Sequence, residues 1–161
     1  MSPKLFELLQ SPRPPWLEIL SASISIEDAQ YVDPATNLTL LHMAVMTHDT
    51  DSNHAESRIG VIRAILELDV TATEVCCLAR GFTPLMYASL VQDLQHDVEW
   101  NVPVVKLLME YNPLAIRLKS PLGHSALDLH IMAMSRLHHD VSSMRHSFQR
   151  SPVGPKRAPP C

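Results

Sequence analysis

Glycine, cysteine and aromatic residues are all scarce in this chain, which has four glycines, three cysteines and 5% aromatic residues. Four glycines leave little from which to build a phosphate-binding loop, and neither a dinucleotide fingerprint nor a nucleophile-elbow motif is present. Three cysteines do not make a disulfide framework, so we expect a reducing, intracellular setting, cytoplasmic or nuclear. With so few aromatic residues the core has to be aliphatic, which suits closely packed helices.

Long apolar runs are also missing. No run reaches the roughly 18 residues of a membrane-spanning helix, and the N-terminus lacks a basic region followed by an apolar core. We therefore expect neither a membrane span nor a secretory signal. The net charge of −4 is unevenly spread, because residues 136–161 hold five Lys or Arg and one Asp, about +4, which leaves about −8 for the first 135 residues. An acidic body argues against nucleic-acid binding.

Three short segments share one pattern, a turn followed by a helix start. In the clearest copy Gly81 can take a positive φ, Thr83 can cap a helix and Pro84 fits the first helical position. Related segments begin at Asn37, 44 residues earlier, and at Gly123, 42 residues later. A near-constant spacing of this kind indicates a repeat architecture.

A second, apolar helix follows the first in each unit. Residues 61–68 match residues 104–111 at an offset of 43, including a basic third residue and a Glu at the seventh place. Ala72 and Ala115 then correspond, and Ala29 stands at the equivalent place in a leading unit. The repeat is therefore turn, helix, loop, helix and extended return, which predicts an all-α fold.

These residues resemble the ankyrin repeat family. The family's Thr-Pro-Leu-His-x-Ala motif matches residues 39–44 and 83–88, and its Val-Val-x-Leu-Leu half matches residues 104–108. The resemblance covers residues 16–135 and implies a solenoid of about three stacked helix-loop-helix repeats with terminal capping helices, a non-enzymatic module that binds another protein. It also implies that His42 makes a structural hydrogen bond between neighbouring turns.

The chain departs from the family in its period and at single positions, because Leu40 replaces the motif proline and Met86 replaces the motif histidine. Its units run 42–44 residues rather than about 33, and the excess lies in two polar segments, 47–57 and 92–101. His130 stands where the family has a small Ala, which indicates that the third unit ends the stack.

The expected organisation has a repeat array between two capped ends. It comprises an N-terminal capping segment (1–15), a leading half-repeat (16–36), repeats at 37–79, 80–121 and 122–135, a C-terminal capping helix (136–149) and a disordered, Pro-rich basic tail (150–161). An alternative for residues 5–9 is a Leu-x-x-Leu-Leu helix that docks in a partner's groove. An alternative for residues 136–149 is a basic amphipathic helix that lies on a membrane surface, which would make the chain a membrane-associated adaptor.

The nine histidines raise the question of a metal site, but their spacing does not bring three or four ligands together as zinc requires. Cys76 and Cys77 lie in a return segment and are expected to pack as small apolar residues. We therefore expect no catalytic residue, metal, cofactor or small-molecule substrate. A metal-binding or enzymatic protein that uses the His-containing inserts is the remaining alternative.

A partner protein is expected to bind the concave face formed by the turn tips and the first helices. The predicted partner-binding residues are Thr36, Leu38, Met46, Arg80, Phe82, Leu90, Leu122, His124 and Met132. The groove is centred on Phe82 and Leu90, and replacing both with Ser is expected to abolish partner capture while the thermal melt stays nearly unchanged. The alternative is that the tips pack on each other, with Leu38 and Phe82 half-buried. We expect a monomer without nucleic-acid partners.

Overall fold

The computed structural model describes residues 4–11, 13–47, 55–90 and 102–135. Among these residues the secondary structure consists of α-helices and short 3-10 helices, with one isolated antiparallel bridge between Val32 and Thr39. The prediction of an all-α fold is therefore confirmed. The C-terminal capping helix (136–149), the tail (150–161) and most of the two inserts lie outside the described residues.

The elements follow one another in short steps along the chain. They are α1 (Lys4–Leu9), α2 (Trp16–Ser21), α3 (Ile26–Ala29), α4 (Leu40–Met46), α5 (Ala55–Leu68), η2 (Val70–Thr73), α6 (Pro84–Ser89), α7 (Val102–Tyr111) and η4 (Pro113–Arg117). Residues 126–135 are also helical.

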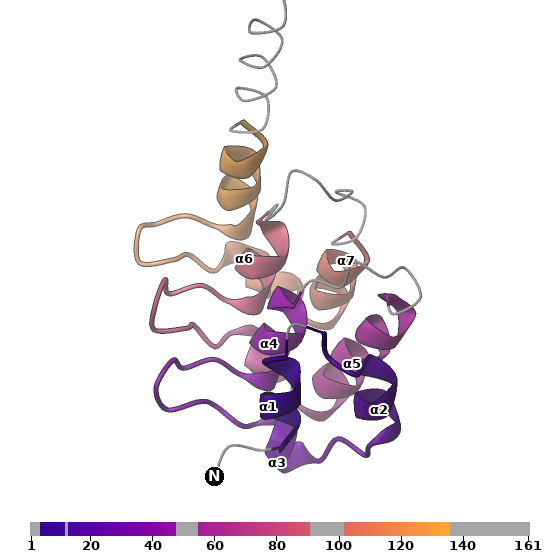
Figure 1. The fold of residues 1–161 in the computed structure, drawn as a ribbon. Helices are drawn as coiled ribbons and strands as arrows, with labels where there is room; N and C mark the ends of the chain where they lie inside the picture. The colour runs from indigo at the N-terminus through magenta and orange to yellow at the C-terminus, as the bar shows by residue number, and fades with distance from the viewer. Residues whose placement is uncertain (1–3, 12, 48–54, 91–101, 136–161) are drawn as a thin grey trace, which may run out of the picture.

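The helices lie in two rows (Figure 1). The first row contains α1, α4, α6 and residues 126–135, and the second contains α2, α5 and α7. Within the rows α4 packs against α1 and α6, and α5 packs against α2 and α7; between the rows α4 packs against α5 and α6 against α7. Three loops, each leading into a first-row helix, project to the same side of the molecule (Figure 1).

The three loops have the same backbone design. Each contains one residue at positive φ, namely Asn37 (57°), Gly81 (63°) and Gly123 (82°). A backbone hydrogen bond closes each loop at its base. The donor and acceptor pairs are Asp33 N to Leu38 O (2.9 Å), Cys77 N to Phe82 O (3.0 Å) and Ser120 N to His124 O (2.8 Å).

The first-row helices that follow these loops begin with the predicted side-chain caps. Thr39 and Thr83 accept hydrogen bonds from backbone N–H groups three residues later, and Pro84 occupies the first turn of α6. Ser125 makes the same bond with the N–H of Asp128. These caps satisfy N–H groups that a helix start otherwise leaves unpaired.

The second half of each unit also recurs. Three side chains cap the short helix that follows the second-row helix: Ser25 before α3, Asp69 before η2 and Asn112 before η4. The three corresponding alanines are almost completely buried: Ala29, Ala72 and Ala115. Their alignment in the sequence is thus matched by equivalent positions in the fold.

The N-terminal segment contributes to the core. Leu5, Phe6 and Leu9 of α1 are buried, and α1 packs on α4. Residues 4–29 therefore supply α1, which covers α4, and then α2 and α3. Because Leu5 and Leu9 face the core, the alternative of a free Leu-x-x-Leu-Leu docking helix is wrong for this fold.

Arg58, which is buried in α5, caps the C-terminus of α4. Its guanidinium donates to the carbonyl oxygens of Ala44 (3.0 Å) and Val45 (2.7 Å). Replacing Arg58 with Met is expected to lower the free energy of unfolding by about 2 kcal/mol, because two carbonyl groups lose a charged donor. Arg63→Met is the matched control, since Arg63 is an exposed Arg on the same helix. Equal denaturation midpoints for the two variants would contradict this role of Arg58.

Candidate partner-binding surface

The most projecting residues of the candidate surface lie at the loop tips. Thr36 and Arg80 are exposed, and Leu122 is the most exposed of the large apolar residues described, at 81%. The backbone N–H of Leu78 donates to the carbonyl oxygen of Thr36 at 2.9 Å, which ties the first loop to the second. These three predicted residues therefore lie on one row of tips.

The next predicted residues lie where each loop returns to its helix. Leu38 and His124 are half-buried, but Phe82 belongs to the core and is only 9% exposed. The Phe82 ring meets the ring of Tyr87 edge to face at 5.5 Å, and the Arg80 guanidinium lies 6.0 Å from its centroid. A central, exposed Phe82 was therefore a wrong prediction, because the side chain folds inward onto α6.

This burial of Phe82 also overturns the expectation that Ser at positions 82 and 90 leaves the melt nearly unchanged. Removing a buried aromatic side chain leaves a cavity and lowers stability. The Phe82 and Leu90 double variant cannot serve as a clean test of binding.

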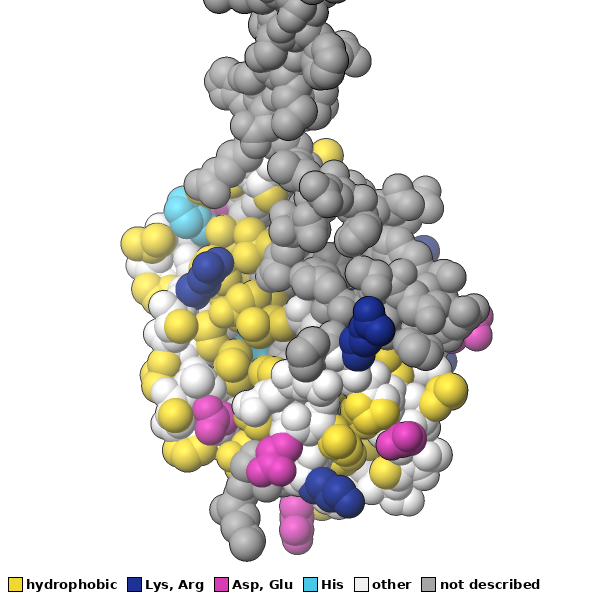
Figure 2. Space-filling view, in the orientation of Figure 1, with side chains coloured by type: hydrophobic (Ala, Val, Ile, Leu, Met, Phe, Trp, Pro, Cys, Tyr) yellow, Lys and Arg dark blue, Asp and Glu magenta, His cyan; other side chains and the backbone are white. Residues whose placement is uncertain are grey.

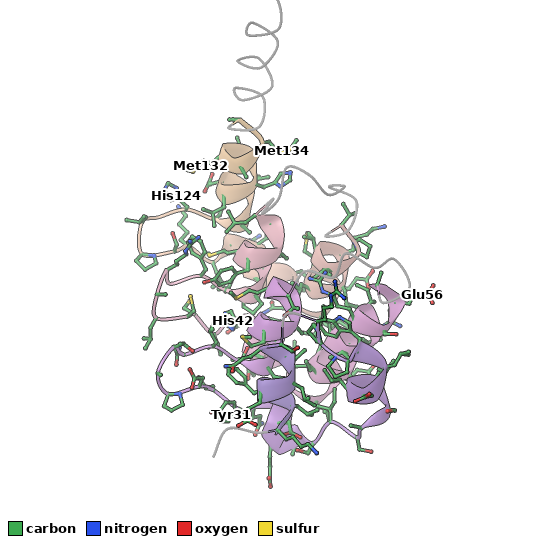
Figure 3. The ribbon with its side chains drawn as sticks, in the orientation of Figure 1. Tyr31, His42, Glu56, His124, Met132 and Met134 are labelled. Atoms are coloured by element: carbon green, nitrogen blue, oxygen red, sulfur yellow. The ribbon has the colours of Figure 1, made fainter. Side chains whose placement is uncertain are left out.

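The predicted residues on the first-row helices are less accessible than the tips. Met46 and Leu90 are half-buried and pack against the core, whereas Met132 is 40% exposed. His124 lies on the third loop and Met132 on the helix at residues 126–135 (Figure 3). Exposure thus increases toward the third unit, where the described part of the stack ends.

Two exposed apolar residues at the loop tips were missed from the sequence. Leu78 is 68% exposed, and Pro34 holds the equivalent place in the first loop, 44 residues earlier. Their equivalent positions in the sequence could have indicated them. Pro34 directly follows Asp33 and Leu78 directly follows Cys77, and the backbone N–H of Asp33 or Cys77 closes the loop at its base. Figure 2 shows apolar side chains gathered over the loops and the first-row helices.

His42 connects α4 to the second loop (Figure 3). Its Nδ1 accepts the Thr39 N–H at 3.2 Å, so Nε2 carries the ring proton and donates it to the carbonyl oxygen of Phe82 at 3.1 Å. Burial lowers the pKa of His42 from 6.5 to about 4, against the opposite effect of the bond to Phe82. The hydrogen bond between neighbouring turns is therefore confirmed.

His130 makes a comparable link at the other end of α6. Its Nδ1 lies 3.1 Å from the carbonyl oxygen of Ser89, the last residue of that helix. The half-buried imidazole thus reaches back toward the preceding unit, at the position that Ala44 and Ala88 hold in the first two units.

The adjacent cysteines have different surroundings. Cys76 is exposed, whereas Cys77 is buried with its Sγ 3.1 Å from the Tyr87 hydroxyl. Burial raises the pKa of the Cys77 thiol, but hydrogen bonds from Tyr87 and from the backbone of Phe82, Arg80 and Gly81 outweigh it and leave that pKa below 9.0. Burial and the bond to Cys77 raise the pKa of Tyr87 to about 12. Cys77 and Tyr87 therefore pack against each other at the base of the second loop.

Within the described ranges, no group of three or more His, Cys, Asp or Glu could hold a metal ion. None of the described helices combines the length and apolarity that crossing a membrane needs. Six of the nine histidines lie outside these ranges, and for them the expectation of no metal site stays a prediction. They are His48, His54, His96, His138, His139 and His146.

Comparisons with known proteins add no relative. No family model, no curated protein and no solved structure matches the chain.

Proposed function

We propose that this chain is a small ankyrin-type solenoid, without enzymatic activity, that binds another protein through its loop tips and first-row helices. The observation that carries the proposal is the exposure of Leu78 (68%) and Leu122 (81%) on adjacent loops. Soluble proteins rarely leave a contiguous apolar patch exposed unless it is a binding surface. The free thiols of Cys76 and Cys77 support an intracellular setting.

Three recurring features support the ankyrin-type assignment. The loops before α4, α6 and residues 126–135 each have one residue at positive φ and lead into a capped helix, and a buried alanine follows each of α2, α5 and α7. In such a stack each unit contacts only its neighbours, and the repeated loops form one extended surface. That surface is the natural place for a partner to bind.

The test uses a double variant in which Leu78 and Leu122 are both replaced by Ser. Because both side chains are exposed, we expect the free energy of unfolding to change by no more than about 0.5 kcal/mol per site. Capture of a partner from lysate of the source cell, followed by mass spectrometry and direct titration, is expected to be lost.

The matched control replaces two equally exposed leucines away from the loops. Leu17 (64% exposed) lies on α2 and Leu114 (62% exposed) on η4. The Leu17→Ser and Leu114→Ser double variant is expected to retain the partner. If both double variants lose it, or if neither does, binding does not depend on the loop tips and the proposal fails.

A further inference from the structure

The last helix of the first row exposes an apolar face that the preceding helices of that row bury. Leu127, the second residue after its helix cap, is 56% exposed, whereas Leu41 and Leu85 at the equivalent place are 0% and 2% exposed. Ile131 is 55% exposed, and its counterpart Val45 is 2% exposed. Leu127 and Ile131 are four residues apart and therefore lie on one side of the helix, which we call the end face.

The cover of α4 and α6 comes in part from elements that follow them in the chain. Both α5 and α6 pack on α4, and α7 packs on α6. In the part of the chain that the structure describes, no element follows residue 135. A segment that follows residue 135 is therefore the natural candidate to cover the end face.

The end face differs from the scattered apolar residues of an ordinary surface. A single exposed leucine needs no explanation, since more than half of a protein surface is apolar. Leu127 and Ile131 are neighbours, and both are more than half exposed at positions where their counterparts are buried. Soluble proteins usually cover or use such a patch, and the open end of a stack of repeated units needs a covering element.

The chain continues with residues of a suitable pattern. Residues 136–161 lie outside the described ranges, and within them Val141, Met144 and Phe148 follow one another at i, i+3 and i+7. This spacing predicts a helix with one apolar face. Residues 136–140 leave five residues for the connection, and two antiparallel helices need only about two to five.

A tethered segment has an advantage over a second copy of the chain. A short tether holds the segment at an effective concentration in the millimolar range, about a thousandfold above a second copy at about 1 µM. Because both occupants would bury the same two side chains, the tether favours the chain's own segment.

We propose that residues 141–148 pack across the end face, bury Leu127 and Ile131, and close the stack at its third unit. The side chains of Val141, Met144 and Phe148 supply the apolar contacts. Binding at the loop tips does not depend on this contact, so each can be tested without the other.

The test compares two pairs of side chains that are about equally exposed among the described residues. Leu127→Gln with Ile131→Gln alters the end face. The matched control is Leu17→Gln with Leu114→Gln, whose natural side chains are 64% and 62% exposed. If residues 141–148 cover the end face, the first double variant lowers the urea midpoint by about 1 M, because buried apolar contacts are lost. The control is expected to leave the midpoint unchanged.

A second variant identifies the covering segment. Val141→Gln with Phe148→Gln, in the full chain, is expected to lower the urea midpoint by a similar amount. When it is combined with the end-face substitutions, the midpoint is expected to fall no further, since both changes remove the same contact. Analytical ultracentrifugation at low and high protein concentration is expected to find monomers of the natural chain.

Three results would overturn the proposal. If the end-face variant behaves like its control, the end face is simply exposed to solvent. If the losses of the two variants add, residues 141–148 pack elsewhere on the molecule. If the natural chain forms a dimer that only the end-face substitutions dissociate, a second copy covers the end face instead.

Discussion

Replacing Gly81 with Ala is expected to lower the free energy of unfolding by about 2–5 kcal/mol. Two costs combine, because Gly81 has φ = 63° and because its added Cβ would lie 2.3 Å from Cδ and 2.4 Å from Cγ of Pro121. A residue other than Gly at such a φ costs about 1–2 kcal/mol. Overpacking against a rigid ring adds about 1–3 kcal/mol. The pyrrolidine ring cannot turn aside as a flexible side chain would, so the third loop has to move.

The control for Gly81→Ala is present in the next loop. Gly123 has φ = 82°, but an added Cβ there meets nothing within 4 Å. Gly123→Ala therefore incurs only the backbone cost of about 1–2 kcal/mol. Urea denaturation followed by circular dichroism measures both variants. If the two glycines prove equally costly, contact between the second and third loops does not contribute to stability.

The contact between Gly81 and Pro121 matters more for joining the second and third loops because Met86 replaces a hydrogen-bonding histidine in the second unit. In the first unit His42 joins its helix to the carbonyl oxygen of the following loop, but Met86 stands at the equivalent place in α6. A thioether cannot donate a hydrogen bond, so this position cannot tie the second unit to the third loop as His42 ties the first unit to the second. The packing of Pro121 on Gly81 supplies contact between these loops instead.

The repeat and its local chemistry could be predicted from the sequence because they depend on neighbouring residues. Thr83 and Pro84 follow rules of helix capping that hold in any fold, and the positive φ of Gly81 follows from the absence of a Cβ. The correspondence of Ala72 and Ala115 followed from one spacing applied twice. These features need no knowledge of the tertiary structure.

The candidate surface was predicted less well because exposure is a tertiary property. Whether Phe82 points outward depends on the position of Tyr87, against which its ring packs, and no local pattern gives that position. Leu78 was missed because its exposure depends on the side of the loop that faces the preceding loop.

The stability of the protein is expected to fall by about 3 kcal/mol between pH 6.5 and pH 4 because of His42 alone. Its pKa is 6.5 when unfolded and about 4 in the fold, where burial disfavours the charged ring. The unfolded chain therefore binds the proton first as the pH falls, and each unit between the two values costs about 1.4 kcal/mol. The stabilisation is complete above pH 6.5 and is lost progressively toward pH 4.

The measurement is the free energy of unfolding from urea titrations across this pH range, for the natural chain and for His42→Gln. The variant is expected to be less stable at neutral pH and to show a flatter pH dependence, so the two curves converge near pH 4. The lowered pKa of Asp128 affects both chains alike and therefore does not disturb the comparison. Parallel curves for the natural chain and His42→Gln would mean that the pKa of His42 is not lowered in the fold.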